Sequence, residues 1–204
     1  MKILFISLGC DKNLADSEEM LGLLTGNGHE IVDSEEEADA IVINTCCFIH
    51  DAKEESVNTI LEMAEYKKTG TCKILIVTGC MAQRYKEEIT EEIPEVDAVL
   101  GTTSYGDIVK ALNEAEAGHV FQEFKDINAL PEDSGRRVIT TGGHFGYLKI
   151  AEGCDKHCTY CIIPSLRGKF RSVPEERLLK QAEYMASQGV RELILVAQET
   201  TVYG

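Results

Sequence analysis

The feature that most constrains the fold is a regular alternation of apolar runs with amphipathic segments. The apolar runs suit buried strands and occupy residues 2–9, 30–32, 39–45, 73–79 and 97–101. The segments with helical periodicity are 14–26, 52–68, 84–93 and 105–118. Continuous apolar strands that alternate with helices indicate a parallel sheet covered on both faces. We therefore predict a doubly wound α/β domain over residues 1–118.

The chain changes character after this domain. Residues 119–144 are mixed and carry Gly, Pro and Asp, which predicts an interdomain linker with a short hairpin. A second unit then follows from residue 145, with strands at 147–153 and 192–198 and a helix at 174–189. One βαβ unit cannot close a barrel or bury both faces of a sheet. We therefore expect residues 145–204 to be the start of an incomplete domain.

Composition narrows the class of protein. No apolar run reaches the length of a membrane span, and the apolar N-terminus lacks a cleavage site, so we expect a cytoplasmic protein. The net charge of −15 predicts repulsion of nucleic acids by this segment and attraction of a basic partner. Eight cysteines are many for a reducing compartment, where metal or redox chemistry is more common than disulfide bonds.

Three cysteines occupy equivalent places in the first domain. Cys10, Cys46 and Cys80 each follow an apolar strand, at the sheet edge where open α/β proteins bind ligands. Thiolates are soft ligands suited to iron–sulfur clusters, so we predict that these three hold one. Two alternatives remain open, namely cysteines that are simply buried apolar residues and a structural zinc site.

Two further cysteines do not fit this pattern. Cys72 precedes the strand that Cys80 follows, so the two should lie at opposite ends of the sheet. Cys47 adjoins Cys46 and points elsewhere. We expect neither to be a ligand.

A second group of cysteines lies in one loop of the second unit. Cys154, Cys158 and Cys161 form a CxxxCxxC motif after a strand that ends in glycine. Three such cysteines can each bind one iron of a 4Fe–4S cluster, which leaves the fourth iron open for another ligand. His157 is expected to be a loop side chain. Lys156, Arg167 and Arg171 either contact substrate or cofactor carboxylate, or form a solvated basic loop.

This motif, with Tyr160 before its last cysteine, resembles the radical S-adenosylmethionine (SAM) signature. Together with the first cysteine set it resembles the radical SAM methylthiotransferase family, over the whole chain. The stretches most similar to the RimO-type branch, which modifies a ribosomal protein, are 7–19, 44–56, 147–168 and 195–204. One departure is Cys47, where the family pattern leads us to expect glycine.

The resemblance implies two 4Fe–4S clusters and S-adenosyl-L-methionine as cofactors, with Tyr160 near the adenine. It implies a radical made at the Cys154/Cys158/Cys161 cluster and a sulfur presented at the Cys10/Cys46/Cys80 cluster. The implied product carries a methylthio group on the β-carbon of an aspartate in small-subunit ribosomal protein twelve. Reduction would require a low-potential donor such as flavodoxin or ferredoxin.

Two other functions remain open. A tRNA adenosine methylthiotransferase would use the same chemistry on another substrate, although such relatives differ from this chain near Cys10 and at 197–201. A non-catalytic iron–sulfur or zinc-binding module belongs to a different class. Because the barrel is incomplete, we expect the 204-residue chain by itself to be inactive.

Overall fold

The computed structural model describes residues 1–132 and 134–204. Its main feature is a six-stranded sheet in the order β2-β1-β3-β4-β5-β6, in which every neighbouring pair is parallel. The strands are β1 (Lys2–Ser7), β2 (Glu30–Val32), β3 (Ala40–Thr45), β4 (Ile74–Gly79), β5 (Ala98–Leu100) and β6 (Phe121–Glu123). The predicted doubly wound α/β fold is confirmed.

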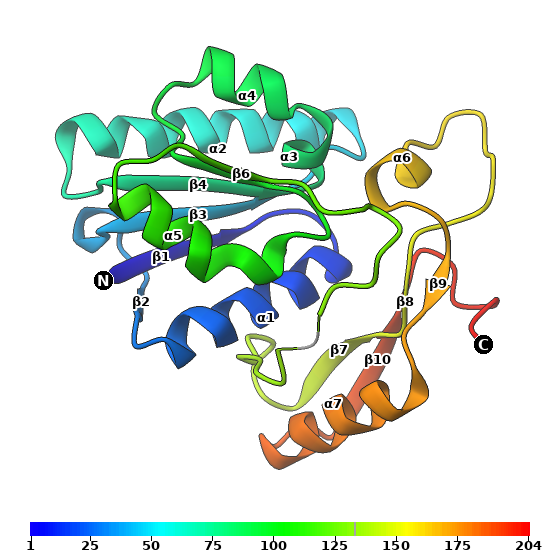
Figure 1. Ribbon diagram of the computed structural model, residues 1–204. Helices are drawn as coiled ribbons and strands as arrows, with labels where there is room; N and C mark the ends of the chain where they lie inside the picture. The colour runs from blue at the N-terminus through cyan, green and yellow to red at the C-terminus, as the bar shows by residue number, and fades with distance from the viewer. Residues whose placement is uncertain (133) are drawn as a thin grey trace.

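Helices cover both faces of this sheet (Figure 1). One face carries α1 (Asp11–Gly26) and α5 (Ile108–Glu116), and the other carries α2 (His50–Thr69), α3 (Cys80–Arg84) and α4 (Lys86–Glu92). Two short 3₁₀ turns, η1 (Glu35–Glu37) and η2 (Tyr105–Asp107), complete this part of the chain.

The strand sequences explain why two helical layers form. Successive residues of a strand point to opposite faces, and in β3 every residue is buried. Ile41 and Ile43 belong to the core under α2, whereas Val42 belongs to the core with Met20 of α1. An unbroken apolar strand therefore needs a helix on each side.

A smaller unit follows, with β7 (Phe145–Lys149) paired in parallel with β10 (Glu192–Val196). The helix α7 (Glu175–Ser187) covers this pair through Leu178 and Met185. A short antiparallel pair, β8 (Ala151–Glu152) and β9 (Arg171–Ser172), flanks the helix α6 (Ile163–Arg167). No helix in the described ranges 1–132 and 134–204 has both the length and the apolar character needed to span a bilayer.

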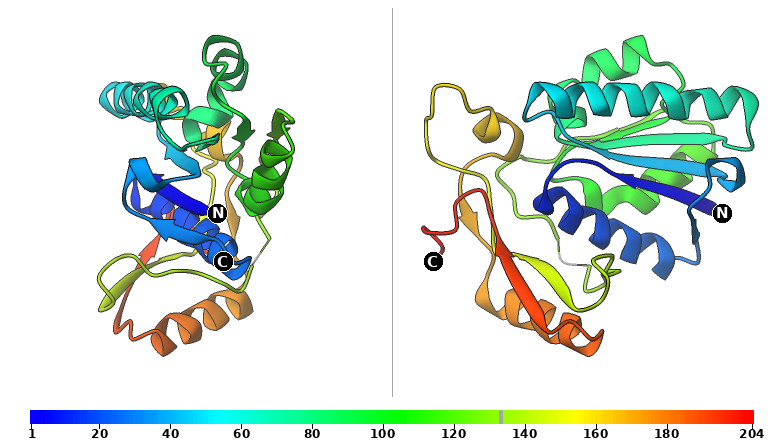
Figure 2. Two further views of the ribbon diagram at one scale, coloured as in Figure 1. Left: turned by 90° about the vertical axis from the view of Figure 1, so that its left-hand side faces the viewer. Right: turned by 180° about the vertical axis from the view of Figure 1, so that it is seen from behind.

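The second unit lies against the carboxyl edge of the large sheet and against α1 (Figures 1 and 2). The order β2-β1-β3 makes the gap between β1 and β3 the topological switch point, because the connections leave these strands in opposite directions. The fold thus places α6 and the loop before it opposite the switch point.

Several predicted boundaries differ from the structure. Residues 121–123, expected within the linker, instead form β6, because a three-residue edge strand without an apolar run gives no clear sequence signal. The predicted hairpin is not found among residues 119–132 and 134–144, and residue 133 of that linker lies outside the described residues. The helix predicted at 84–93 is found as α4, and the short helix α3, which was not predicted, precedes it and ends at Arg84.

Candidate functional site

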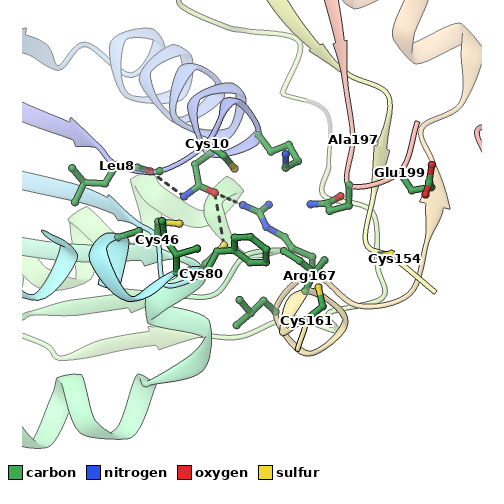
Figure 3. Close-up of a pocket in the computed structure, with 18 of the residues that line it drawn as sticks. Leu8, Cys10, Cys46, Cys80, Cys154, Cys161, Arg167, Ala197 and Glu199 are labelled. Carbon is green, nitrogen blue, oxygen red and sulfur yellow. Dashed lines mark hydrogen bonds between the residues drawn. The ribbon is translucent and has the colours of Figure 1, made fainter. Parts of the chain in front are cut away.

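All six predicted cysteine ligands line one cavity of about 1070 Å³ between the two units. Cys10, Cys46 and Cys80 lie on the side of the large sheet, and Cys154 and Cys161 lie across the cavity from them (Figure 3). Cys158 and Tyr160 also line it. Its size matches that of sites for small molecules and cofactors.

The first three cysteines come from three loops at the switch-point edge. Cys10 immediately precedes α1, Cys46 follows β3, and Cys80 is the first residue of α3. Gly9 makes their close approach possible, since its φ is +98° and an added Cβ would lie 2.7 Å from the Cβ of Cys46. Any larger residue there would push Cys10 and Cys46 apart.

Asn13, in the first turn of α1, ties these three loops together. Its Nδ2 donates hydrogen bonds to Leu8 O (3.1 Å) and Thr45 O (3.0 Å), just before Cys10 and Cys46 in the chain. Its Oδ1 accepts from Cys80 Sγ at 3.8 Å. The side chain is fully buried, so these bonds are not exchanged for bonds to water. One amide therefore fixes the positions of all three loops.

The other surroundings of the first set are also fixed. Ser56 Oγ accepts from Cys46 N (3.0 Å) and donates to Cys46 O (2.8 Å), which anchors that loop to α2. Burial raises the pKa of the Cys80 thiol, and the positive charge of Arg167 opposes this rise. The cation thus favours the thiolate form that a metal requires.

The two cysteines predicted not to be ligands lie outside the residues that line the cavity. Cys72 is buried at the opposite end of β4, with Sγ donating to Ile74 O at 3.3 Å. Cys47 points into the apolar core under α2, and its Sγ donates to Cys80 O at 3.3 Å. Burial raises the pKa of Cys47 to about 12, which keeps it a neutral thiol.

The second cysteine loop is more exposed than the first set. Cys158 is exposed, while Cys154 and Cys161 are half-buried. Backbone bonds shape the loop: Cys154 N donates to Gly168 O (3.1 Å), and Cys161 N donates to Cys158 O (3.0 Å). Tyr160 is 86% exposed, which leaves its ring free to contact a bound molecule. His157 is exposed and is not among the residues that line the cavity.

The three basic residues near this loop have three different roles. Lys156 forms an ion pair with Glu199, and both side chains line the cavity. Arg171 donates to the main-chain oxygens of Ala129 (2.9 Å) and Arg167 (2.8 Å). Arg167 is 2% exposed, so the alternative of a solvated basic loop is wrong for this residue.

Arg167 belongs to a buried group of four charges. Its Nη1 lies 2.7 Å from Asp16 Oδ2 and 3.5 Å from Glu152 Oε1. Lys149 pairs with both of the same carboxylates. Buried charges require such partners, and this group joins α1 to the second unit. Asn13 and Asp16 were not predicted as site residues, although their spacing of three places them on one face of α1.

The donor set fits iron–sulfur clusters better than a single ion. In the ranges 1–132 and 134–204, no three His, Cys, Asp or Glu side chains are arranged to hold one metal ion. Ligands of a cluster bind different iron atoms, so they must surround a shared space without converging on one point. Three thiols around one side of a cavity, with Cys154 and Cys161 across from them, fit that requirement, whereas a structural zinc site usually has four ligands around one ion.

The sequence comparisons agree with this division of the chain. Residues 2–101 match the model described as "Uncharacterized protein family UPF0004", and residues 148–204 match the radical SAM superfamily. Over 204 residues the chain is 66% identical to a protein of Lachnoclostridium phytofermentans named ribosomal protein uS12 methylthiotransferase RimO. It is 51% identical over 204 residues to a Clostridioides difficile protein of the same name. All of this chain is covered in both comparisons.

The chain spans just under half the length of these curated relatives, 46% in each case. The predicted resemblance to RimO-type methylthiotransferases is confirmed along the whole chain. The six cysteines fall within the two matched segments, three in each.

Proposed function

Because the chain corresponds in sequence to the N-terminal region of RimO-type radical SAM methylthiotransferases, we propose that it is the two-cluster part of such an enzyme. Cys10, Cys46 and Cys80 hold one 4Fe–4S cluster, and Cys154, Cys158 and Cys161 hold the other. The observation that carries the proposal is the single cavity lined by both cysteine sets. Two clusters on opposite sides of one space can act on the same substrate atom.

The residues of the chain supply position and enclosure. Asn13 and Ser56 hold the first set in place, and the carbonyl of Gly168, just after α6, anchors the second loop at Cys154. Tyr160 and the Lys156–Glu199 pair border the space in which S-adenosylmethionine would bind. The cofactors supply, when bound, a carbon-centred radical and a transferable methylthio group, which acid–base side chains cannot provide at an unactivated C–H bond.

For the substrate we propose the β-carbon of an aspartate in small-subunit ribosomal protein twelve, in line with the names of the relatives. Charge supports a basic protein partner, since the chain carries a net charge of −15. The low-potential electron donor is flavodoxin or ferredoxin. A cytoplasmic location is consistent with eight cysteines that are all free.

Metal analysis tests the two-cluster assignment. After anaerobic reconstitution, the chain should bind two 4Fe–4S clusters, and the triple variant Cys154→Ala/Cys158→Ala/Cys161→Ala should retain half of the iron and sulfide. The variant Cys10→Ala/Cys46→Ala/Cys80→Ala should retain the other half. Full iron content in either triple variant, or zinc without sulfide in the parent chain, would rule out the proposal.

Mass spectrometry tests the substrate. The complete protein, expressed in a host without its own methylthiotransferases, should add a methylthio group to the ribosomal-protein aspartate and leave tRNA unmodified. A methylthio group on a tRNA adenosine would instead establish the tRNA branch, without affecting the cluster assignment.

A further inference from the structure

The buried guanidinium of Arg167 lies between the two cysteine sets (Figure 3). It projects from α6, directly after the second cysteine loop, yet its Nη2 donates to Asn13 Oδ1 at 2.6 Å. The Nδ2 of the same side chain donates to Leu8 O and Thr45 O, next to Cys10 and Cys46. Arg167 is therefore one hydrogen-bonded residue away from the first set, although it belongs to the element that carries the second.

The four buried charges around Arg167 are arranged asymmetrically. The group contains two negative side chains and two positive ones, namely Asp16, Glu152, Lys149 and Arg167. Lys149 pairs with the two carboxylates, whereas Arg167 pairs with them and also donates to Asn13. The positive side of the group thus faces the first cysteine set.

Three thiolates and a cluster, at a site where Cys46 and Cys80 are buried and Cys10 is exposed, concentrate negative charge. A buried charge nearby acts through a low dielectric and is weakly screened by salt. Arginine suits this place because its planar fork can bond to Asn13 and to Asp16 at once, which a lysine ammonium cannot do in the same geometry.

Resting on the proposed function, we propose that Arg167 is a positioning residue for the cluster at Cys10, Cys46 and Cys80. It fixes Asn13 against the loops of Cys10 and Cys46, and its charge raises the reduction potential of that cluster. Asp16 has the opposite electrostatic effect, because it neutralises part of the Arg167 charge. A side chain of the second unit thereby adjusts the reduction potential of the cluster that the first unit holds.

The test isolates the first cluster in the 204-residue chain with Cys154, Cys158 and Cys161 all changed to alanine. Redox titration followed by electron paramagnetic resonance gives its midpoint potential. Arg167→Met should lower the reduction equilibrium constant by about tenfold, the order of the Coulomb attraction between an added electron and one nearby positive charge. Asp16→Asn should shift the midpoint in the opposite direction. Arg191→Met, an exposed arginine at the far end of β10, is the matched control and should change nothing.

A purely structural role predicts a different pattern. Loss of packing would weaken iron binding in both variants without opposite shifts in potential. Arg167→Lys keeps the positive charge but loses the planar guanidinium. Its midpoint potential should therefore stay close to that of the parent, while it should bind less iron. An unchanged midpoint in Arg167→Met with full iron, or a downward shift in Asp16→Asn, overturns the proposal.

A check of folding and two further variants keep the test decisive if Arg167→Met folds poorly. Circular dichroism of the apo-protein shows whether each variant is folded, and if Arg167→Met is not, Asp16→Asn and Arg167→Lys decide the outcome. Failure of the proposed function is distinguishable, since the isolated first set would then bind no iron even with Arg167 intact.

Discussion

Replacing Asn13 with alanine should destabilise the apo-protein by about 3 kcal/mol. The substitution removes two neutral hydrogen bonds, to Leu8 O and Thr45 O, a long and weak bond from Cys80 Sγ, and one charged bond from Arg167. Neutral bonds contribute about 1 kcal/mol each and a charged one about 2 kcal/mol. Asn13 is fully buried, so water cannot replace it, and local relaxation recovers only part of the loss.

Urea denaturation followed by far-ultraviolet circular dichroism measures this change in the free energy of unfolding. The control is Asn113→Ala, on the exposed face of α5, which should stay within about 0.5 kcal/mol of the parent. The denaturation slope should remain constant, since the surface exposed on unfolding does not change. A loss below about 1 kcal/mol would show that the bonds of Asn13 do not hold the three cysteine loops, and would refute the reasoning.

Three further predictions follow from buried groups. Glu18→Gln should lower the free energy of unfolding by about 3 kcal/mol in the same assay, because it leaves the buried guanidinium of Arg137 (Nη2–Oε2, 2.6 Å) without its counter-charge. An unchanged free energy of unfolding would show that the pair is not formed. Burial raises the pKa of Glu19, so the folded state favours its protonated form. Ionisation of Glu19 therefore destabilises the fold as pH rises above the unfolded-state pKa. Glu19→Gln should raise the free energy of unfolding at neutral pH but not in acid. Equal effects at both pH values would contradict this assignment. Changing Cys47 and Cys72 to alanine together should leave iron content and the cluster spectrum unchanged, as measured by metal analysis and absorbance, and a clear loss of iron would identify one of them as a ligand.

The sequence predicted the site better than it predicted the contacts that support it. The cysteines could be placed because each follows an apolar run, and parallel strands bring their carboxyl ends to one edge. Asn13 and Arg167 could not be paired, since they are far apart in the chain and no pattern marks a hydrogen bond between them. The helix α6 was also missed, because five residues containing a proline show too little periodicity. Local patterns predict elements, whereas side-chain partners depend on how units dock.

The two cysteine sets differ in how much of the chain must be organised before each can bind iron. Cys154 to Cys161 lie in one short loop, whose closure costs little conformational entropy. Cys10, Cys46 and Cys80 meet only after β1, β3 and β4 have paired in register, which requires long-range contacts that form slowly. The time at which the first set takes up iron therefore reports when the sheet has formed. A refolding chain supplied with iron and sulfide should fill its sites in the reverse of their order along the sequence.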